Sequence, residues 1–203
     1  MRKPFFGLSR FKITGVAGFI LIIFLGMAPL LFAGGHFGGT FDPDLGITIK
    51  IYQEGSSAEV PSMNFGTLLE TASGGGRVLR GNVGFVVFIY PQVNYIYQIY
   101  CTGSDLTNGD GYKLPAGACV VTPVYAPGDN NGNAPPPGSS AGSPGSWVTS
   151  AHRVIYTDSN GEYRAIQAHF AIREDIPGAT QAVPIAQPSG TYTGTVVFTI
   201  IDI

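Results

Sequence analysis

The chain has 203 residues, the size of one domain, and glycine and proline together contribute 44 of them (29 Gly and 15 Pro). Charged residues make up only 12% of the chain, which argues against a helical bundle rich in Ala, Leu, Glu and Lys. A hydrophobic content of 44% is enough to build a core and argues against a disordered protein, while a formal charge of −2 argues against a nucleic-acid binder.

The first 33 residues have the pattern of an export signal. Residues 1–12 carry four basic residues and no acid, and residues 13–33 carry no charge. A basic segment followed by an apolar one that ends on a small residue predicts a signal peptide, here cleaved after Ala33. An apolar stretch of about 20 residues can also span a bilayer, so an uncleaved anchor is the alternative. In either case residues 34–203 are expected to be secreted or displayed on the cell surface.

The next segment, residues 34–53, is expected to be an N-terminal extension that runs into a first strand. It is rich in glycine up to residue 44, and then the apolar residues alternate with smaller or polar ones. This period-two pattern is typical of a half-buried strand. The alternating apolar residues are Leu45, Ile47, Ile49 and Ile51.

Residues 54–203 are predicted to form the folded domain, an all-β sandwich of about seven or eight strands. Residues 83–90 are almost continuously apolar, which predicts a strand that is buried on both faces. The Asn160-Gly161 dipeptide favours a positive-φ turn, and it predicts a hairpin of residues 150–157 with residues 162–172. The other predicted strands are 93–101, 118–125, 147–156, 162–173 and 190–202.

One segment of the predicted domain has a different composition. Residues 126–146 contain only Ala, Pro, Gly, Asp, Asn and Ser. Proline blocks ladder pairing and these small residues bury little surface, so a long exposed loop is predicted here. This loop is interpreted either as a solvent-facing decoration or as an insertion without a function.

The chain has two cysteines, Cys101 and Cys119, and both lie in the part that is expected to be exported. An even number of cysteines in an oxidising compartment predicts a disulfide. The bond would close a loop of about 17 residues and stabilise the fold by about 3 kcal/mol. A metal site or a catalytic thiol is the alternative, but neither cysteine has a histidine close to it in the sequence.

The sequence offers little support for catalysis. The three histidines, His36, His152 and His169, are not spaced like metal ligands, and the chain contains no Gly-x-Ser-x-Gly nucleophile motif. No catalytic, metal or cofactor-binding residue is therefore predicted, and the chain is expected not to be an enzyme. An exported enzyme is a further alternative, because thirteen acidic residues are available to form a carboxylate pair.

The functional prediction rests on the two ends of the presumed domain. In the last strand four apolar residues fall on one face, and they are predicted to line a groove: Tyr192, Val196, Phe198 and Ile200. The alternating run from Leu45 to Ile51 is predicted to be a donor strand that inserts into this groove in a neighbouring copy. Such a contact is head-to-tail and does not close, so it makes a fibre. In the alternative, residues 45–51 are an ordinary first strand of a complete domain, and a donor, if there is one, lies nearer 34–44, with only Phe37 and Phe41 as apolar plugs.

Four short motifs resemble the spore coat protein U-like, archaic chaperone–usher pilin family. These are Met63 to Thr67 (MNFGT), the paired central strands from Asn82 to Cys101, Val154 to Asp158 (VIYTD) and Ser189 to Val196 (SGTYTGTV). The resemblance implies an incomplete immunoglobulin-like β-sandwich that is completed by a strand from the N-terminal extension of another subunit. It further implies polymerisation into a surface fibre, with a periplasmic chaperone and an outer-membrane usher as partners.

The sequence thus predicts a structural subunit of an extracellular filament or pilus that polymerises by donor-strand exchange and needs no cofactor. The main alternative is a self-contained secreted module for adhesion or carbohydrate binding. In that case Tyr95, Tyr97 and Tyr100 are the residues expected to stack on sugars.

Overall fold

The computed structural model describes residues 46–92, 95–125, 137–161 and 165–203. The predicted leader, Leu45 with the rest of the extension, and the first half of the predicted loop lie outside these ranges. The described residues are strands and turns apart from one short 3-10 helix, Ala116–Ala118, which confirms the predicted all-β class. None of their helical residues forms a segment long and apolar enough to cross a membrane.

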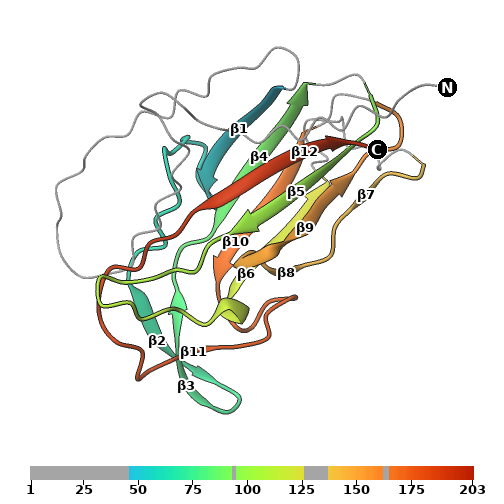
Figure 1. The fold of residues 1–203 in the computed structure, drawn as a ribbon. Coiled ribbons are helices and arrows are strands. Elements are labelled where there is room, and N and C mark those ends of the chain that lie inside the picture. Colours follow the sequence, from blue (N-terminus) through green and yellow to red (C-terminus); the bar gives the residue numbers. More distant parts are fainter. Residues whose placement is uncertain (1–45, 93–94, 126–136, 162–164) are drawn as a thin grey trace.

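Two antiparallel sheets form the body of the molecule and face each other (Figure 1). The first sheet contains, in spatial order, β1 (Gly46–Gln53), β4 (Phe85–Gln92), β10 (Ile166–Ile172), β6 (Cys119–Tyr125) and β8 (Gly145–Ser146). The second sheet contains, in the same way, β12 (Val196–Asp202), β5 (Tyr97–Gly103), β9 (Thr149–Thr157) and β7 (Ser140–Ala141).

A small third sheet was not anticipated from the sequence. It lies at the end of the sandwich away from the C-terminus (Figure 1). Its strands, in spatial order, are β11 (Val183–Pro184), β3 (Gly76–Gly81) and β2 (Leu68–Ser73). The tight β2–β3 connection uses Gly76 at φ 142°, a backbone conformation that residues with a Cβ rarely adopt.

Every second side chain along the strands points inward, and these inward side chains fill the space between the two large sheets. In β10 and in β5 every second side chain is fully buried, and these inward side chains belong to one core cluster. Trp147, which precedes β9, is also fully buried, and its ring centroid lies 6.0 Å from that of Phe170. β4 was predicted to be buried on both faces, but only its inward residues (Phe85, Val87 and Ile89) are fully covered.

The predicted hairpin around Asn160-Gly161 is wrong. β9 pairs with β5 and β7, whereas β10 pairs with β4 and β6, so the chain crosses from one sheet to the other between them. The turn itself is as expected, because Gly161 has φ 67°. The carboxylate of the buried Asp158 accepts hydrogen bonds from the backbone N–H groups of Asn160 and Gly161, which stabilises this crossing.

The prediction of an exposed loop at residues 126–146 is wrong for its second half. β7 pairs with β9, and β8 pairs with β6. The small side chains allow close packing here: a Cβ added to Gly142 would lie 1.9 Å from the carbonyl oxygen of Val154. The composition that suggested a loop is therefore what lets this segment lie against the sandwich.

The strand order has the character of an immunoglobulin-like sandwich. In an immunoglobulin-like sandwich the first sheet usually has the strand order A-B-E-D. In this chain β1, β4, β10 and β6 stand in the places of A, B, E and D. The second sheet of such a sandwich usually has the strand order G-F-C. In this chain β12 and β5 stand in the places of F and C. Among the described residues no strand takes the G place, on the outer side of β12.

Candidate functional site

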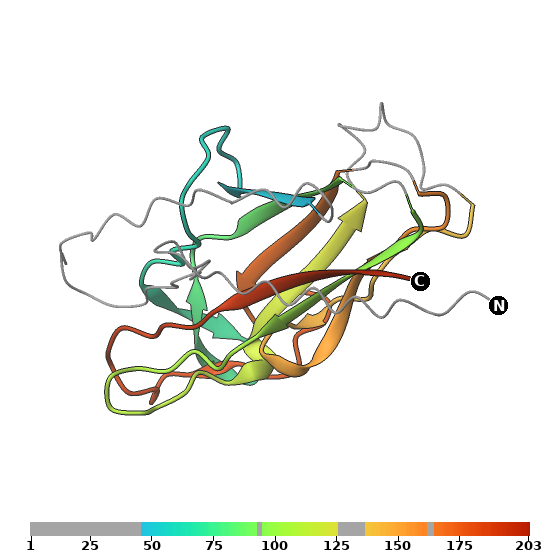
Figure 2. The ribbon, with the colours of Figure 1, turned by 45° about the horizontal axis from the view of Figure 1, so that its top comes forward.

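The two large sheets are joined along one long side of the sandwich but not along the other. On one side, residues 140–146 run from β7 in the second sheet to β8 in the first. On the other side, β1 and β12 are the edge strands: no described strand pairs with the outer edge of β12, and the outer edge of β1 is bridged only near its end, where Tyr52 pairs with Glu59. Figure 2 shows β1 and β12 as separate edges of the two layers. We call the side bounded by β1 and β12 the open side.

The residues predicted to line a groove lie beside the open side. Tyr192, Val196 and Ile200 are buried, and Phe198 is half-buried with its ring edge-on to that of Phe170 at 6.1 Å. Val197, between them, points outward and is 43% exposed. Val196, Phe198 and Ile200 thus share the inner face of β12, whereas Tyr192 lies before the strand, and the use of these residues as an acceptor groove stays a prediction.

The residues predicted to be donated belong to the chain's own sheet, contrary to the first interpretation. Ile47, Ile49 and Ile51 lie in β1, which pairs along its whole length with β4 of the same chain. Their alternation correctly indicated a half-buried strand, but alternation does not specify which chain supplies the partner strand. The structure agrees with the alternative in which β1 is the first strand of the domain, and residues 34–44 are then the candidate donor.

Burial is incomplete where the core meets the open side. Ile47 and Ile49 on β1 and Phe198 on β12 pack against the core but stay half-buried. One strand further in, Val87 and Ile89 on β4 are at most 1% exposed. Apolar surface that remains in contact with water at this edge is worth about 25 cal/mol per Å² to any strand that covers it.

The predicted disulfide is absent. Cys101 in β5 and Cys119 in β6 are free thiols, both fully buried. They lie in strands of the two different large sheets, and their sulfur atoms are not bonded to each other. Burial raises the pKa of the Cys101 thiol to about 12 and raises that of Cys119 further. Both thiols are therefore protonated and unreactive at neutral pH.

The three tyrosines proposed to stack on sugars do not form one surface. Tyr97 is fully buried, with its ring centroid 6.1 Å from that of Tyr156, and the hydroxyl of Tyr95 is buried as well. Tyr100 faces outward, and its ring lies 5.2 Å from that of His152. A stacking platform made of these three residues is therefore excluded.

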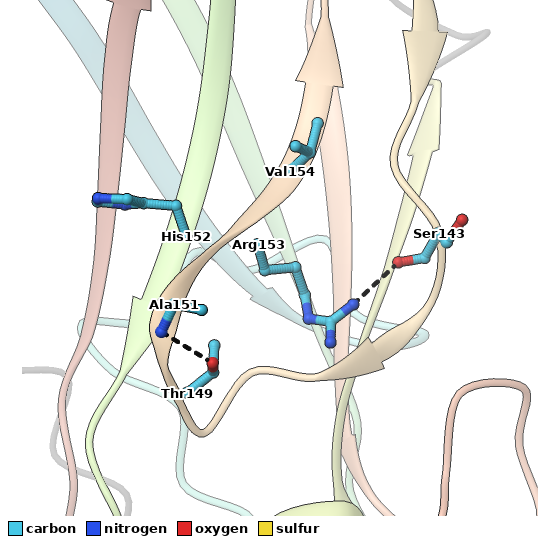
Figure 3. A pocket seen from close by; sticks show the side chains of 6 residues that line it. All are labelled: Ser143, Thr149, Ala151, His152, Arg153 and Val154. Carbon is cyan, nitrogen blue, oxygen red and sulfur yellow. Dashed lines mark hydrogen bonds between the residues drawn. The ribbon is translucent and has the colours of Figure 1, made fainter.

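A hollow of about 320 Å³ lies on the second sheet, and Figure 3 shows its lining residues: Ser143, Thr149, Ala151, His152, Arg153 and Val154. The guanidinium of Arg153 donates to the backbone carbonyls of Ser146 (2.6 Å) and Ser143 (3.4 Å), so it holds the β7–β8 segment in place. His152 points the other way from its strand (Figure 3). The two basic side chains do not converge on a common point, and the hollow offers no acid–base pair.

A cluster of ion pairs fastens the small sheet to the segment after β10. Arg80 on β3 contacts both Glu174 and Asp175, and Arg173 contacts Asp175 at 2.8 Å. The hydrogen bond from Arg80 lowers the pKa of Glu174, and the one from Arg173 lowers the pKa of Asp175. A carboxyl group whose pKa is lower in the folded state stabilises the fold above its unfolded pKa, and this stabilisation disappears as the pH falls through the folded pKa.

The variant Glu174→Gln is accordingly expected to have a lower Tm than the unaltered chain at pH 7, and the difference should shrink as the pH falls below about 4. Thermal melts from pH 7 to pH 2 would measure it. The control is Glu70→Gln, which breaks the exposed ion pair with Arg77 and should change the Tm little at any pH. A Tm difference for Glu174→Gln that stays constant down to pH 2 would contradict this electrostatic account.

The open side differs from the sequence-based prediction mainly in the role of β1, which forms one of its two edges. Ile47 and Ile49 were assigned to a donated strand, whereas they line the open side from within the chain. The alternation that marks them was visible in the sequence, but the pairing with β4 was not. Comparisons with the known protein families, with curated proteins and with solved structures found no match to this chain.

Proposed function

We propose that this chain is a structural subunit of an extracellular filament or pilus, joined head-to-tail by strand addition. Residues 34–44 of one copy would occupy the open side of the next copy, between β1 and β12. The observation that carries this proposal is the combination of a strand place beside β12 that none of the described residues fills with half-buried core residues at the open side (Ile47, Ile49 and Phe198).

The proposed donor matches the open side in length and in pattern. Eleven residues in extended conformation span about 36 Å, and the seven residues of β12 span about 23 Å. Phe37 and Phe41 are four residues apart, so both side chains point to the same face of a strand. Main-chain hydrogen bonds to the edge of β12 would supply affinity, and the two aromatic side chains would fix the register.

The export pattern at the N-terminus supports an extracellular location for such a fibre. A free strand edge beside exposed apolar side chains favours uncontrolled aggregation, so a subunit in transit needs its open side covered. A periplasmic chaperone and an outer-membrane usher, the partners that the family resemblance implies, would meet this need. No cofactor is required for strand addition.

The deletion of residues 34–44 from the whole chain tests the proposal. The unaltered chain is expected to form filaments, and the deletion variant is expected to remain monomeric, as seen by negative-stain microscopy and size-exclusion chromatography. Deletion of residues 126–136, an equally long stretch of the Pro- and Gly-rich segment, is the control and should leave filaments intact. Filaments formed by the variant that lacks residues 34–44 would refute strand addition by this segment.

A self-contained binding module is the second candidate, and an aromatic cluster on the outer face of the first sheet favours it. The rings of Tyr52 and Phe88 lie 5.4 Å apart, those of Phe88 and Tyr90 lie 6.2 Å apart, and the ammonium of Lys50 lies 5.9 Å from the Tyr90 ring. Aromatic and cationic side chains of this kind contact sugars in many binding sites. A chain that stays monomeric at high concentration and binds polysaccharide less well after Phe88→Ala would favour this second function.

A further inference from the structure

The edge strand β12 is apolar on both of its faces. Val196, Phe198 and Ile200 point into the core, while Val197 and Ile201 point outward, and its first charged residue is Asp202. A sequence that is apolar on both faces is typical of strands covered on both sides. Edge strands usually carry charged residues or proline, which prevent pairing with other molecules. β12 therefore has the composition of a central, covered strand but the position of an edge strand.

Val197 and Ile201, which point outward from β12, form a patch with Ile96, which directly precedes β5, and Ile203, which directly follows β12. We call these four residues the outer patch. Ile201 lies opposite Gln98, and the backbone N–H of Ile203 donates to the carbonyl of Ile96 at 3.3 Å. Ile96 and Ile203 are 41% and 54% exposed, so with Val197 the patch holds three of the large apolar side chains that are most exposed in the described ranges.

The surroundings of the outer patch are mostly polar and neutral, and their charged side chain is that of Asp202, which is exposed between Ile201 and Ile203. Thr199 on β12 and the outward residues of β5 (Gln98, Tyr100 and Thr102) complete this face of the two strands. Apolar residues surrounded by neutral polar ones, with charges depleted, are typical of the centre of a protein–protein interface. A surface that only needed to stay soluble would carry Lys or Glu at such positions on an edge strand.

We propose that the outer patch packs against a second copy of this chain, in a contact separate from strand addition. The inference rests on the proposed function, because a copy that adds a strand to the edge of β12 must bring its own body close to this face. Two neighbouring strands about 23 Å long present roughly 200 Å² on one face, against about 800 Å² per partner in a stable interface. The patch is therefore too small to hold a partner alone, but it is continuous with the edge to which the strand would be added.

The double variant Val197→Thr/Ile201→Thr in the whole chain tests this contact. Threonine keeps the β-branch that suits a strand and adds a hydroxyl on the outer face only. The concentration at which half of the chain is assembled, measured by light scattering and sedimentation, is expected to rise at least about tenfold. The matched control is Val124→Thr, on the outer face of β6 in the other sheet, which should assemble like the unaltered chain.

The outcomes separate this inference from the proposed function. If the double variant assembles like the unaltered chain while deletion of residues 34–44 abolishes assembly, the outer-patch contact is refuted and strand addition stands. If the deletion variant assembles normally and the double variant does not, strand addition by residues 34–44 fails, and the outer patch belongs to an interface other than the one proposed, so both proposals are refuted. A chain that remains monomeric at every concentration refutes both. Should the double variant melt well below the unaltered chain, the single variant Val197→Thr replaces it in the same assay, with the same outcomes.

Discussion

Replacement of Trp147 by alanine is expected to destabilise the fold by about 3–5 kcal/mol, the usual loss when a large buried aromatic residue is truncated. The side chain is fully buried, and its ring packs edge-on against Phe170 between the two large sheets. For a domain of this size the loss corresponds to a fall in Tm on the order of 10 °C. Circular dichroism should follow the melt, because Trp147 is the only tryptophan of the chain and its fluorescence is lost in the variant.

The space left by Trp147 cannot readily close, because the backbone of β5 is packed directly against it. A Cβ added to Gly103 would lie 2.4 Å from the carbonyl oxygen of Trp147 and 2.8 Å from Cε3 of its ring. The control is Tyr112→Ala, which removes an aromatic ring from a side chain that is 53% exposed and should change the stability by no more than about 0.5 kcal/mol. Equal losses in the two variants would show that burial between the sheets is not what makes Trp147 important.

The alternation of apolar and polar residues was the sequence pattern from which most of the fold could be predicted. Alternating runs, together with the continuously apolar run at 83–90, predicted a strand at each of the long strands of the two large sheets, and alternation assigned Val196 and Ile200 to the inner face of the last one. The reason is physical: a strand that packs one face on a core needs apolar residues at every second position, whatever its neighbours are. The all-β class follows from the number of such segments and from the turn residues between them.

The alternation pattern did not show which strands pair with one another. The Asn160-Gly161 turn fits a hairpin, but it fits equally well a crossing between two sheets, and the partners of β9 and β10 are chosen by packing far along the chain. The short strands β7, β8 and β11 have two residues each, too few for a periodic pattern. The pairing of β7 depends on close approach at small residues such as Gly142, in a segment whose composition alone suggested a loop.

The open side shows the same limit for the functional prediction. The inward-facing residues of the last strand, Val196 and Ile200, could be assigned correctly, because only their own alternation was needed. The other edge of the open side, β1, was mistaken for the donor, since an alternating strand next to a Gly-rich extension has the same pattern whether it completes its own sheet or another one. Only the pairing of β1 with β4 moves the candidate donor to residues 34–44.

A peptide with the sequence of residues 34–44 is expected to stabilise the chain that lacks them. A ligand that binds only the folded state stabilises it by about 2.7 kcal/mol when its concentration is 100 times its Kd. For a domain of this size each kcal/mol raises the Tm by about 2–4 °C, so a rise of about 5–10 °C is expected at saturating peptide. The free energy comes from main-chain pairing along the edge of β12 and from covering Ile47, Ile49 and Phe198.

A peptide in which Phe37 and Phe41 are both replaced by serine separates this specific fit from unspecific strand pairing. It keeps the main chain and the length of the original, so it retains the edge hydrogen bonds but lacks the apolar side chains that would enter the open side. We expect it to raise the Tm by less than a third of the shift given by the original peptide. Equal shifts from both peptides would mean that no side-chain register exists, and no shift from either would mean that the segment does not fill the open side. In the second case the half-buried residues on β1 and β12 must be covered by something other than a neighbour's N-terminal strand.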